Sequence, residues 1–225
     1  MAHPRRQVLR LIVPVACALA LPVDGSACQF DLSGSKADRV FFVLGMLFES
    51  PAPRGMAGPS HVESFFCSEK DKAPVFTRAV TGLAREQGLP ADLRVETKQG
   101  CLTLLQSPAI APRLNACYLR GARSLPLTLF TRPATQIGER QAVAAKDLDR
   151  RRALAYVAGV WARHRSDRSI VLTAGTAKAD LVATLLKALG CANVRVESSV
   201  GSTPGSNTVR FEPTAEVSEW LGKSW

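Results

Sequence analysis

Apolar residues recur at every third or fourth position in four segments of the chain, the spacing typical of helices with one buried face. Two of these segments end at Gly88 and Gly190, and glycine is the residue that most often terminates a helix. The first segment is more apolar than a surface helix requires, so it is either a core helix or a docking face for a partner. The predicted helices cover residues 36–50, 73–88, 150–164 and 179–190.

Shorter apolar runs, bounded by glycine, proline and small polar residues, predict strands. Residues 92–106 have the pattern of a hairpin with its turn near Gln99 and Gly100. Residues 113–121 are a further short strand or a turn. No internal repeat is evident in the sequence. The other predicted strands cover residues 127–130, 169–175, 194–200 and 208–213.

The first 27 residues have the layout of a signal peptide. A basic stretch is followed by an apolar run and then by small residues before Cys28. The apolar run is too short to span a bilayer comfortably, which disfavours the alternative of a retained membrane anchor. We therefore divide the chain into a signal peptide (1–27), an amino-terminal α+β domain (28–120), a second domain (125–212) and a carboxy-terminal tail (213–225).

Export would place the cysteines in an oxidising compartment, where disulfides form. The pairing that needs the fewest assumptions joins Cys101 to Cys117 and Cys28 to Cys67, although sequence does not fix connectivity. Cys191 lies between a predicted helix and a strand, where a small apolar residue suits the core, so we expect it to be reduced. Because Cys28 would directly follow the cleavage site, lipidation of Cys28 is a second interpretation.

The chain carries a formal net charge of +10, with basic clusters at residues 150–152 and 163–168. These clusters are either solvated helix ends or a surface that attracts anionic lipids or polymers. No nucleic-acid recognition motif or aromatic platform accompanies them, so nucleic acid is not an expected partner. His61 and His164 form no metal-binding or catalytic motif, which predicts a protein without metal, cofactor or enzymatic activity.

The order of elements in residues 125–212 resembles the OmpA-like domain, the peptidoglycan-binding module of Gram-negative envelope proteins. The segment "KADLVATLLKALG" is similar to a helix of that family with the pattern Arg-Ala-x-x-Val-x-x-Tyr-Leu-x-x-x-Gly. The segment "LTLFTRPATQI" is similar to its first strand, and "NTVRFE" to its closing Asn-Arg-Arg-Val-Glu. The resemblance implies an α/β fold (an α+β sandwich) in which a βαβαββ domain follows a small disulfide-bearing α+β domain.

The sequence departs from that family where the ligand binds. Residues 175–178, Gly-Thr-Ala-Lys, stand where the family has Gly-His-Thr-Asp, so the carboxylate that would pair with the ligand's ammonium is absent. A lysine also cannot reproduce the bidentate contact of arginine with a carboxylate. The candidate ligand-binding residues are therefore those of a rebuilt site around Thr176, Lys178 and Arg210. The alternative is that Thr176 caps the helix and Lys178 is a solvated charge.

Together these features predict a non-enzymatic, exported cell-envelope protein, located in the periplasm or at the outer membrane. Its role would be that of a structural or binding component of an envelope or secretion assembly. Its partner would be an envelope protein or peptidoglycan, with membrane contact only through a lipid anchor. Two alternatives stay open: a peptidoglycan binder with the rebuilt site, and a periplasmic inhibitor or immunity-type protein that binds a partner enzyme.

Overall fold

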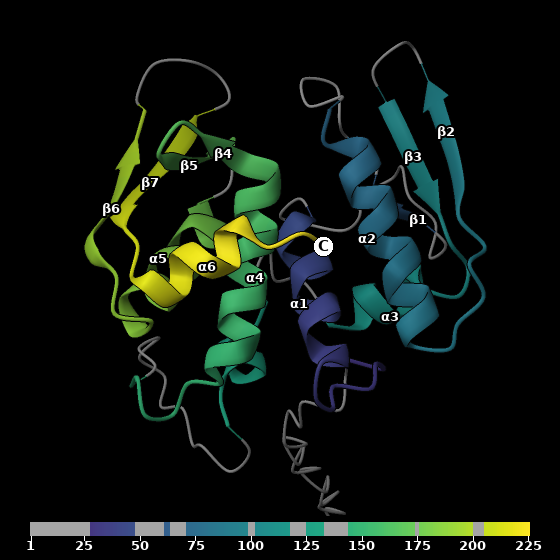
Figure 1. Ribbon diagram of the computed structural model, residues 1–225. Helices are drawn as coiled ribbons and strands as arrows, with labels where there is room; N and C mark the ends of the chain where they lie inside the picture. Colours follow the sequence, from purple (N-terminus) through teal and green to yellow (C-terminus); the bar gives the residue numbers. More distant parts are fainter. Residues whose placement is uncertain are drawn as a thin grey trace, which may run out of the picture.

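Two helices, α1 (Lys36–Met46) and α4 (Arg150–His164), lie side by side at the centre of the molecule (Figure 1). The predicted helices at these positions are confirmed, and α1 is a helix of the core, since its residues from Val40 to Met46 are mostly inaccessible to solvent. The computed structural model describes residues 28–47, 61–63, 71–98, 102–117, 125–132, 144–173, 176–199 and 205–225.

The close approach of α1 and α4 depends on one glycine in each helix. A Cβ atom on Gly45 would overlap the backbone of Tyr156 and Val160 in α4. A Cβ atom on Gly159 would likewise overlap the carbonyl of Phe42 in α1. The two backbones are therefore in direct contact at this crossing, where any side chain would force the helices apart.

Each half of the chain repeats the same order of elements around its central helix. In both halves the central helix is followed by a strand or a short hairpin, a second helix, a further hairpin and a final helix. The first half comprises α1, β1 (His61–Glu63), α2 (Ala73–Glu86), β2 (Arg94–Lys98), β3 (Leu102–Gln106) and α3 (Ala111–Ala116). The second comprises α4, β4 (Arg165–Ser166), β5 (Ser169–Thr173), α5 (Thr176–Ala188), β6 (Ala192–Ser198), β7 (Ser206–Glu212) and α6 (Ala215–Gly222).

The two sheets show the same repeat. The first has the order β1-β3-β2, and the second has the order β4-β5-β7-β6 with all pairs antiparallel. Removing the two-residue strand β4 leaves β5-β7-β6, which matches the first sheet strand for strand. The sheets lie on opposite sides of the central helix pair (Figure 1). An internal repeat that is not evident in the sequence is therefore present in the structure.

The structure shows a mixed α+β protein, in which strands β1 and β4 were not predicted and three further elements differ from the sequence prediction. Residues Leu127–Phe130 form a 3-10 helix instead of a strand, with Leu129 and Phe130 buried. Part of the predicted strand or turn at 113–121 belongs to helix α3. The expected tail contains helix α6, which Thr214 caps by accepting a hydrogen bond from the amide of Val217. The two antiparallel strands of the predicted hairpin at 92–106 are confirmed, while its turn near Gln99 and Gly100 lies outside the described residues. The remaining predicted helices and strands are confirmed within one or a few residues of their described ends.

Charged groups and the carboxy-terminal residues add contacts to the central helix pair. Asp38 of α1, which is buried, accepts two hydrogen bonds from the guanidinium of Arg151 in α4, at 2.6 and 2.8 Å. The indole of Trp225 stacks on Phe42 with 4.2 Å between ring centroids. The segment that follows α6 in the second half therefore reaches back to α1 in the first.

Candidate functional site

The four-stranded sheet has one face covered by helices and one face open. Along β7, Asn207, Val209 and Phe211 are buried, whereas Arg210 and Glu212 between and beyond them are exposed. Helices α4 and α5 pack against the buried side, and Figure 1 shows α4, α5 and α6 to one side of this sheet. Because successive side chains of a strand point to opposite faces, Arg210 belongs to the open face.

Two arginines stand directly opposite each other on the open face. Arg195 of β6 is the register partner of Arg210 of β7, and both are exposed. Like charges in this position repel, so the pair weakens the sheet unless an anion lies between them. Glu197 pairs with Arg210 at 3.0 Å, while the described residues give Arg195 no ion pair. The open face of β6 and β7 therefore carries two arginines and two glutamates: Glu197 pairs with Arg210, and Glu212 lies two positions further along β7.

The neighbouring positions of the open face are small and polar. Thr208 lies between Val171 and Glu197 in the register, and Ser206 lies opposite Thr173. Hydroxyl groups beside arginines suit an anionic polymer, because both donate hydrogen bonds to phosphate oxygens. We name Arg195, Arg210, Thr208 and Ser206 the outer-face cluster.

The first sheet also has an exposed arginine. By strand order β2 corresponds to β6, and Arg94 at the start of β2 is exposed, opposite Gln106 in the register. Apart from Arg94 and Gln106, the side chains of this sheet are not among those that the structure describes. The backbone repeat nevertheless places a second sheet on the opposite flank of the helix pair (Figure 1).

A second basic group lies at the carboxyl ends of the central helices. The buried Lys178 of α5 donates to the carbonyls of Gly45 and Leu47, at 2.7 and 2.5 Å. Arg163, also buried, donates to the carbonyl of Met46 at 2.7 Å. These carbonyls end helix α1 and have no partner within it, so the cations stabilise the negative end of the helix.

His164 belongs to the same group, with its Nε2 3.4 Å from Nζ of Lys178. Burial, together with the positive charges of Lys178 and Arg163, holds the pKa of His164 well below its ordinary value. The imidazole is therefore neutral at physiological pH.

The structure does not bring the three predicted ligand-binding residues together. Lys178 is buried against α1, which excludes both a ligand contact at its ammonium and a solvated charge. Arg210 is on the open face of the sheet, on the other side from Lys178. Thr176 is exposed at the start of α5, where its hydroxyl accepts a hydrogen bond from the side-chain amide of Asn207 at 3.3 Å.

The cysteines pair differently from the prediction. Cys28 is bonded to Cys117, in place of the expected Cys28–Cys67 and Cys101–Cys117 pairs. The bond also occupies the sulfur of Cys28 that a lipid would need. Cys67 and Cys101 lie outside the described residues. Cys191 is reduced and buried, as predicted, and burial raises the pKa of its thiol.

Two further findings concern metal ions and membranes. Among the described residues, no group of three or more His, Cys, Asp or Glu side chains is placed to hold a metal ion. At the carboxyl ends of α1 and α4, the positive charges of Arg163 and Lys178 disfavour a divalent cation. In the part of the chain that is described, no helix has the length and apolar character needed to cross a membrane.

Comparison with solved structures identifies the fold. No protein-family model matches the sequence, and no curated protein matches it either. A mesophilic variant of the homing endonuclease I-DmoI superposes with a TM-score of 0.52 at 12% identity, covering 84% of this chain and 95% of that one. A second I-DmoI variant, in complex with its target DNA in the presence of Mg, has a TM-score of 0.50 at 12% identity, covering 78% of this chain and 90% of that one.

A third structure, another I-DmoI variant with target DNA nicked in the coding strand and with Mn, also gives a TM-score of 0.50 at 12% identity. It covers 84% of this chain and 98% of that one. The likeness therefore extends over both halves of the molecule. At this identity it shows a shared fold and no more.

These findings correct the resemblance to the OmpA-like domain. The structures that match are homing endonucleases, and the likeness spans both halves instead of residues 125–212 alone. The element that would be the first strand of an OmpA-like domain is the 3-10 helix at Leu127–Phe130. The structure confirms the helix predicted at 179–190. Its buried apolar face and terminal glycine are common to many α+β folds, so they do not identify the OmpA-like family.

The functional expectations are corrected as well. The envelope or secretion role, the peptidoglycan-binding and inhibitor alternatives, and the periplasmic or outer-membrane location do not agree with the matching structures, which are of a homing endonuclease. The same structures contradict the expectation of a non-enzyme and of no nucleic-acid partner, since they include complexes with target DNA. The predicted signal peptide, residues 1–27, lies outside the described residues.

Sequence reasoning missed Arg195, although a signal for it exists. The segments "VRVE" and "VRFE" each place an arginine between apolar residues of a strand, with a glutamate two positions later. Alternation alone puts both arginines on open faces of strands. What the sequence does not reveal is the register that sets them opposite each other.

Proposed function

We propose that this protein binds double-stranded DNA across the open faces of its two sheets. The observation that carries the proposal is the opposed pair Arg195 and Arg210 on an uncovered sheet face, where only Arg210 is paired with an acid, Glu197, among the described residues. A phosphate group placed between the two guanidinium groups would remove their mutual repulsion and accept hydrogen bonds from both.

Two features of the whole molecule support DNA over a small anion. The repeat supplies two sheets, one on each flank of a single helix pair, and the proposal requires that one duplex contacts both (Figure 1). The net charge of +10 favours association with a polyanion of any sequence. The solved structures that share the fold include two in which it holds target DNA.

The proposal is tested by fluorescence anisotropy with a labelled DNA duplex of random sequence, titrated with full-length protein at several salt concentrations. We expect binding that weakens steeply as salt rises, because phosphate contacts release counterions. The double variant Arg195→Gln/Arg210→Gln should bind more weakly. It should also lower the slope of log K against log salt by about 2, since each lost phosphate contact removes about one unit.

The matched control is Arg85→Gln, which removes an exposed arginine from the last turn of helix α2 instead of from a strand. It changes the net charge by one and should change the salt slope by much less than half of the double variant's effect. Equal effects per charge in both variants would mean that binding follows net charge alone, and would overturn the assignment to the sheet face. The same mixtures, with Mg²⁺ or Mn²⁺ added, are analysed for strand breaks, because the matching structures are endonucleases.

A further inference from the structure

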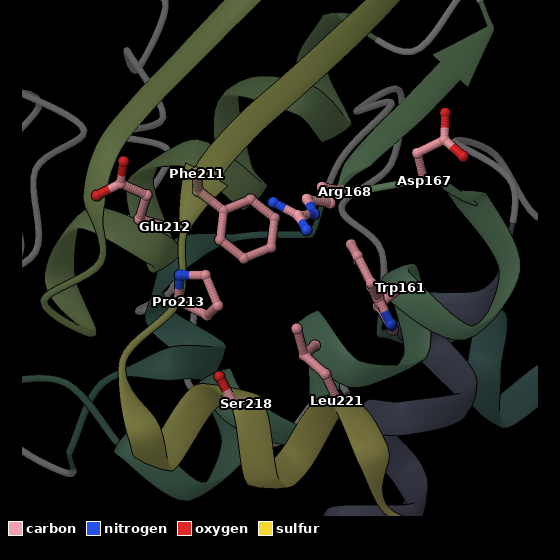
Figure 2. A pocket seen from close by; sticks show the side chains of 8 residues that line it. All are labelled: Trp161, Asp167, Arg168, Phe211, Glu212, Pro213, Ser218 and Leu221. Atoms are coloured by element: carbon pink, nitrogen blue, oxygen red, sulfur yellow. The ribbon is translucent and has the colours of Figure 1, made fainter.

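A cavity of about 460 Å³ lies on the helix side of the second sheet, away from the outer-face cluster. Its walls come from the end of α4, the turn between β4 and β5, the end of β7 and helix α6 (Figure 2). This volume is in the range of small-molecule sites. The residues lining it are Trp161, Asp167, Arg168, Phe211, Glu212, Pro213, Ser218 and Leu221.

The cavity has aromatic and aliphatic walls around a single inward-pointing charge. Trp161 and Phe211 meet edge to face, with 6.0 Å between ring centroids, and Leu221 closes the side formed by α6. Figure 2 shows the guanidinium of Arg168 directed into the space beside Phe211. The carboxylates of Asp167 and Glu212 point away from it (Figure 2).

The position of Arg168 is fixed by the backbone. Ser166 and Ser169 are register partners, so Asp167 and Arg168 form a two-residue hairpin turn. Asp167 has a φ of 51°, a left-handed conformation that this turn requires and that aspartate tolerates. None of the described residues forms an ion pair or hydrogen bond with the guanidinium of Arg168, so its donors are available to a ligand.

We propose that this cavity binds a small aromatic carboxylate. The planar ring of such a ligand lies among Trp161, Phe211 and Leu221, where its burial is favourable. Its carboxylate accepts two hydrogen bonds from the fork of Arg168, and the hydroxyl of Ser218 is a further donor on the same wall. The cavity is separate from the outer-face cluster, so binding of this ligand does not depend on the proposed binding of DNA.

The test is isothermal titration calorimetry of the full-length protein with indole-3-acetate, the neutral indole-3-acetamide, and acetate. We expect saturable binding of indole-3-acetate, binding of the amide about tenfold weaker because the charge-assisted bonds to Arg168 are lost, and none of acetate. Arg168→Gln should weaken indole-3-acetate to the level of the amide, whereas the control Arg165→Gln, an exposed arginine outside the cavity, should not.

A second variant, Leu221→Trp, fills the cavity and should abolish binding of both indole compounds. Circular dichroism spectra of each variant report whether the fold is kept. The proposal is overturned if no indole compound binds saturably to the parent protein. It is also overturned if acid and amide bind equally, or if Leu221→Trp binds as well as the parent with its fold intact.

Discussion

Three basic residues illustrate how this protein uses charge inside its core. Lys178, Arg163 and His164 cluster at the carboxyl end of α1, where two of them donate hydrogen bonds to terminal carbonyls of the helix. Three buried positive charges would repel one another strongly. The low pKa of His164 removes one of the three, so the cluster carries the charges of Lys178 and Arg163 only.

The neutral state of His164 makes stability depend on pH. Its pKa in the folded protein is lowered from the ordinary value of 6.5, so below that value the unfolded chain binds a proton that the folded chain does not. Stability should therefore fall as pH decreases from about 7 to about 5, by up to about 1.4 kcal/mol per pH unit from this group. Urea unfolding at a series of pH values measures the slope.

The control for this prediction is His164→Gln, which cannot titrate. The variant should show a shallower dependence than the parent over the same interval, whatever its absolute stability. Identical slopes would mean that His164 takes up its proton equally well in the folded state.

At the scale of elements, the contact of α1 with α4 organises the molecule. It joins the two halves through backbone atoms at Gly45 and Gly159, and the ion pair of the buried Asp38 with the exposed Arg151 adds a link between the helices. A contact between backbones leaves no room for adjustment by a change of rotamer. The rest of each half then packs outward from its own central helix.

Gly159→Ala should therefore be strongly destabilising. Its methyl group would overlap the carbonyl of Phe42, and the helices would have to separate along their length. Overpacking of this kind costs about 1–3 kcal/mol, and direct contact with backbone atoms favours the upper end. Thermal and urea denaturation measure the loss.

Gly222→Ala is the matched control, because a Cβ at this position, the last residue of α6, meets no other atom within 4 Å. It should leave stability unchanged or raise it slightly, since alanine favours helix over glycine. A loss in Gly159→Ala no larger than the change in this control would contradict the close approach of α1 and α4.

At the scale of the whole molecule, the halves are joined by contacts that run between distant parts of the chain. The Cys28–Cys117 disulfide closes the first half, linking the residues before α1 and after α3 across 89 positions. The stack of Trp225 on Phe42 brings residue 225 against the first central helix. A fold of two similar units is therefore held by contacts within each unit and across the boundary.

Removing the disulfide should lower stability substantially. For a closed loop of this length the entropic model gives about 4.6 kcal/mol, because the unfolded chain loses a long-range constraint. The double variant Cys28→Ser/Cys117→Ser should unfold at lower denaturant than the oxidised parent, and added reductant should bring the parent to the same midpoint. Peptide mapping without reduction should give a Cys28–Cys117 link; a Cys28–Cys67 or Cys101–Cys117 link would contradict it.

Local physics in the sequence determined most of the secondary structure. Helical spacing and the terminal glycines Gly88 and Gly190, which have φ angles of 64° and 85°, predict helices that the structure confirms. Residues 127–130 form a 3-10 helix instead of the predicted strand, because a short apolar run without periodicity is compatible with either conformation.

Only the tertiary structure decided which residues meet. The sequence determined that Lys178 follows a strand and that Arg195 and Arg210 lie on strands, but burial and strand register depend on contacts between residues far apart in the chain. Lys178 is buried because the end of α1, more than 130 positions earlier, supplies carbonyls to its ammonium. The internal repeat is not visible in the sequence for the same reason. The two halves keep the same strand order and contact each other through one glycine in each central helix, but they share few other residues.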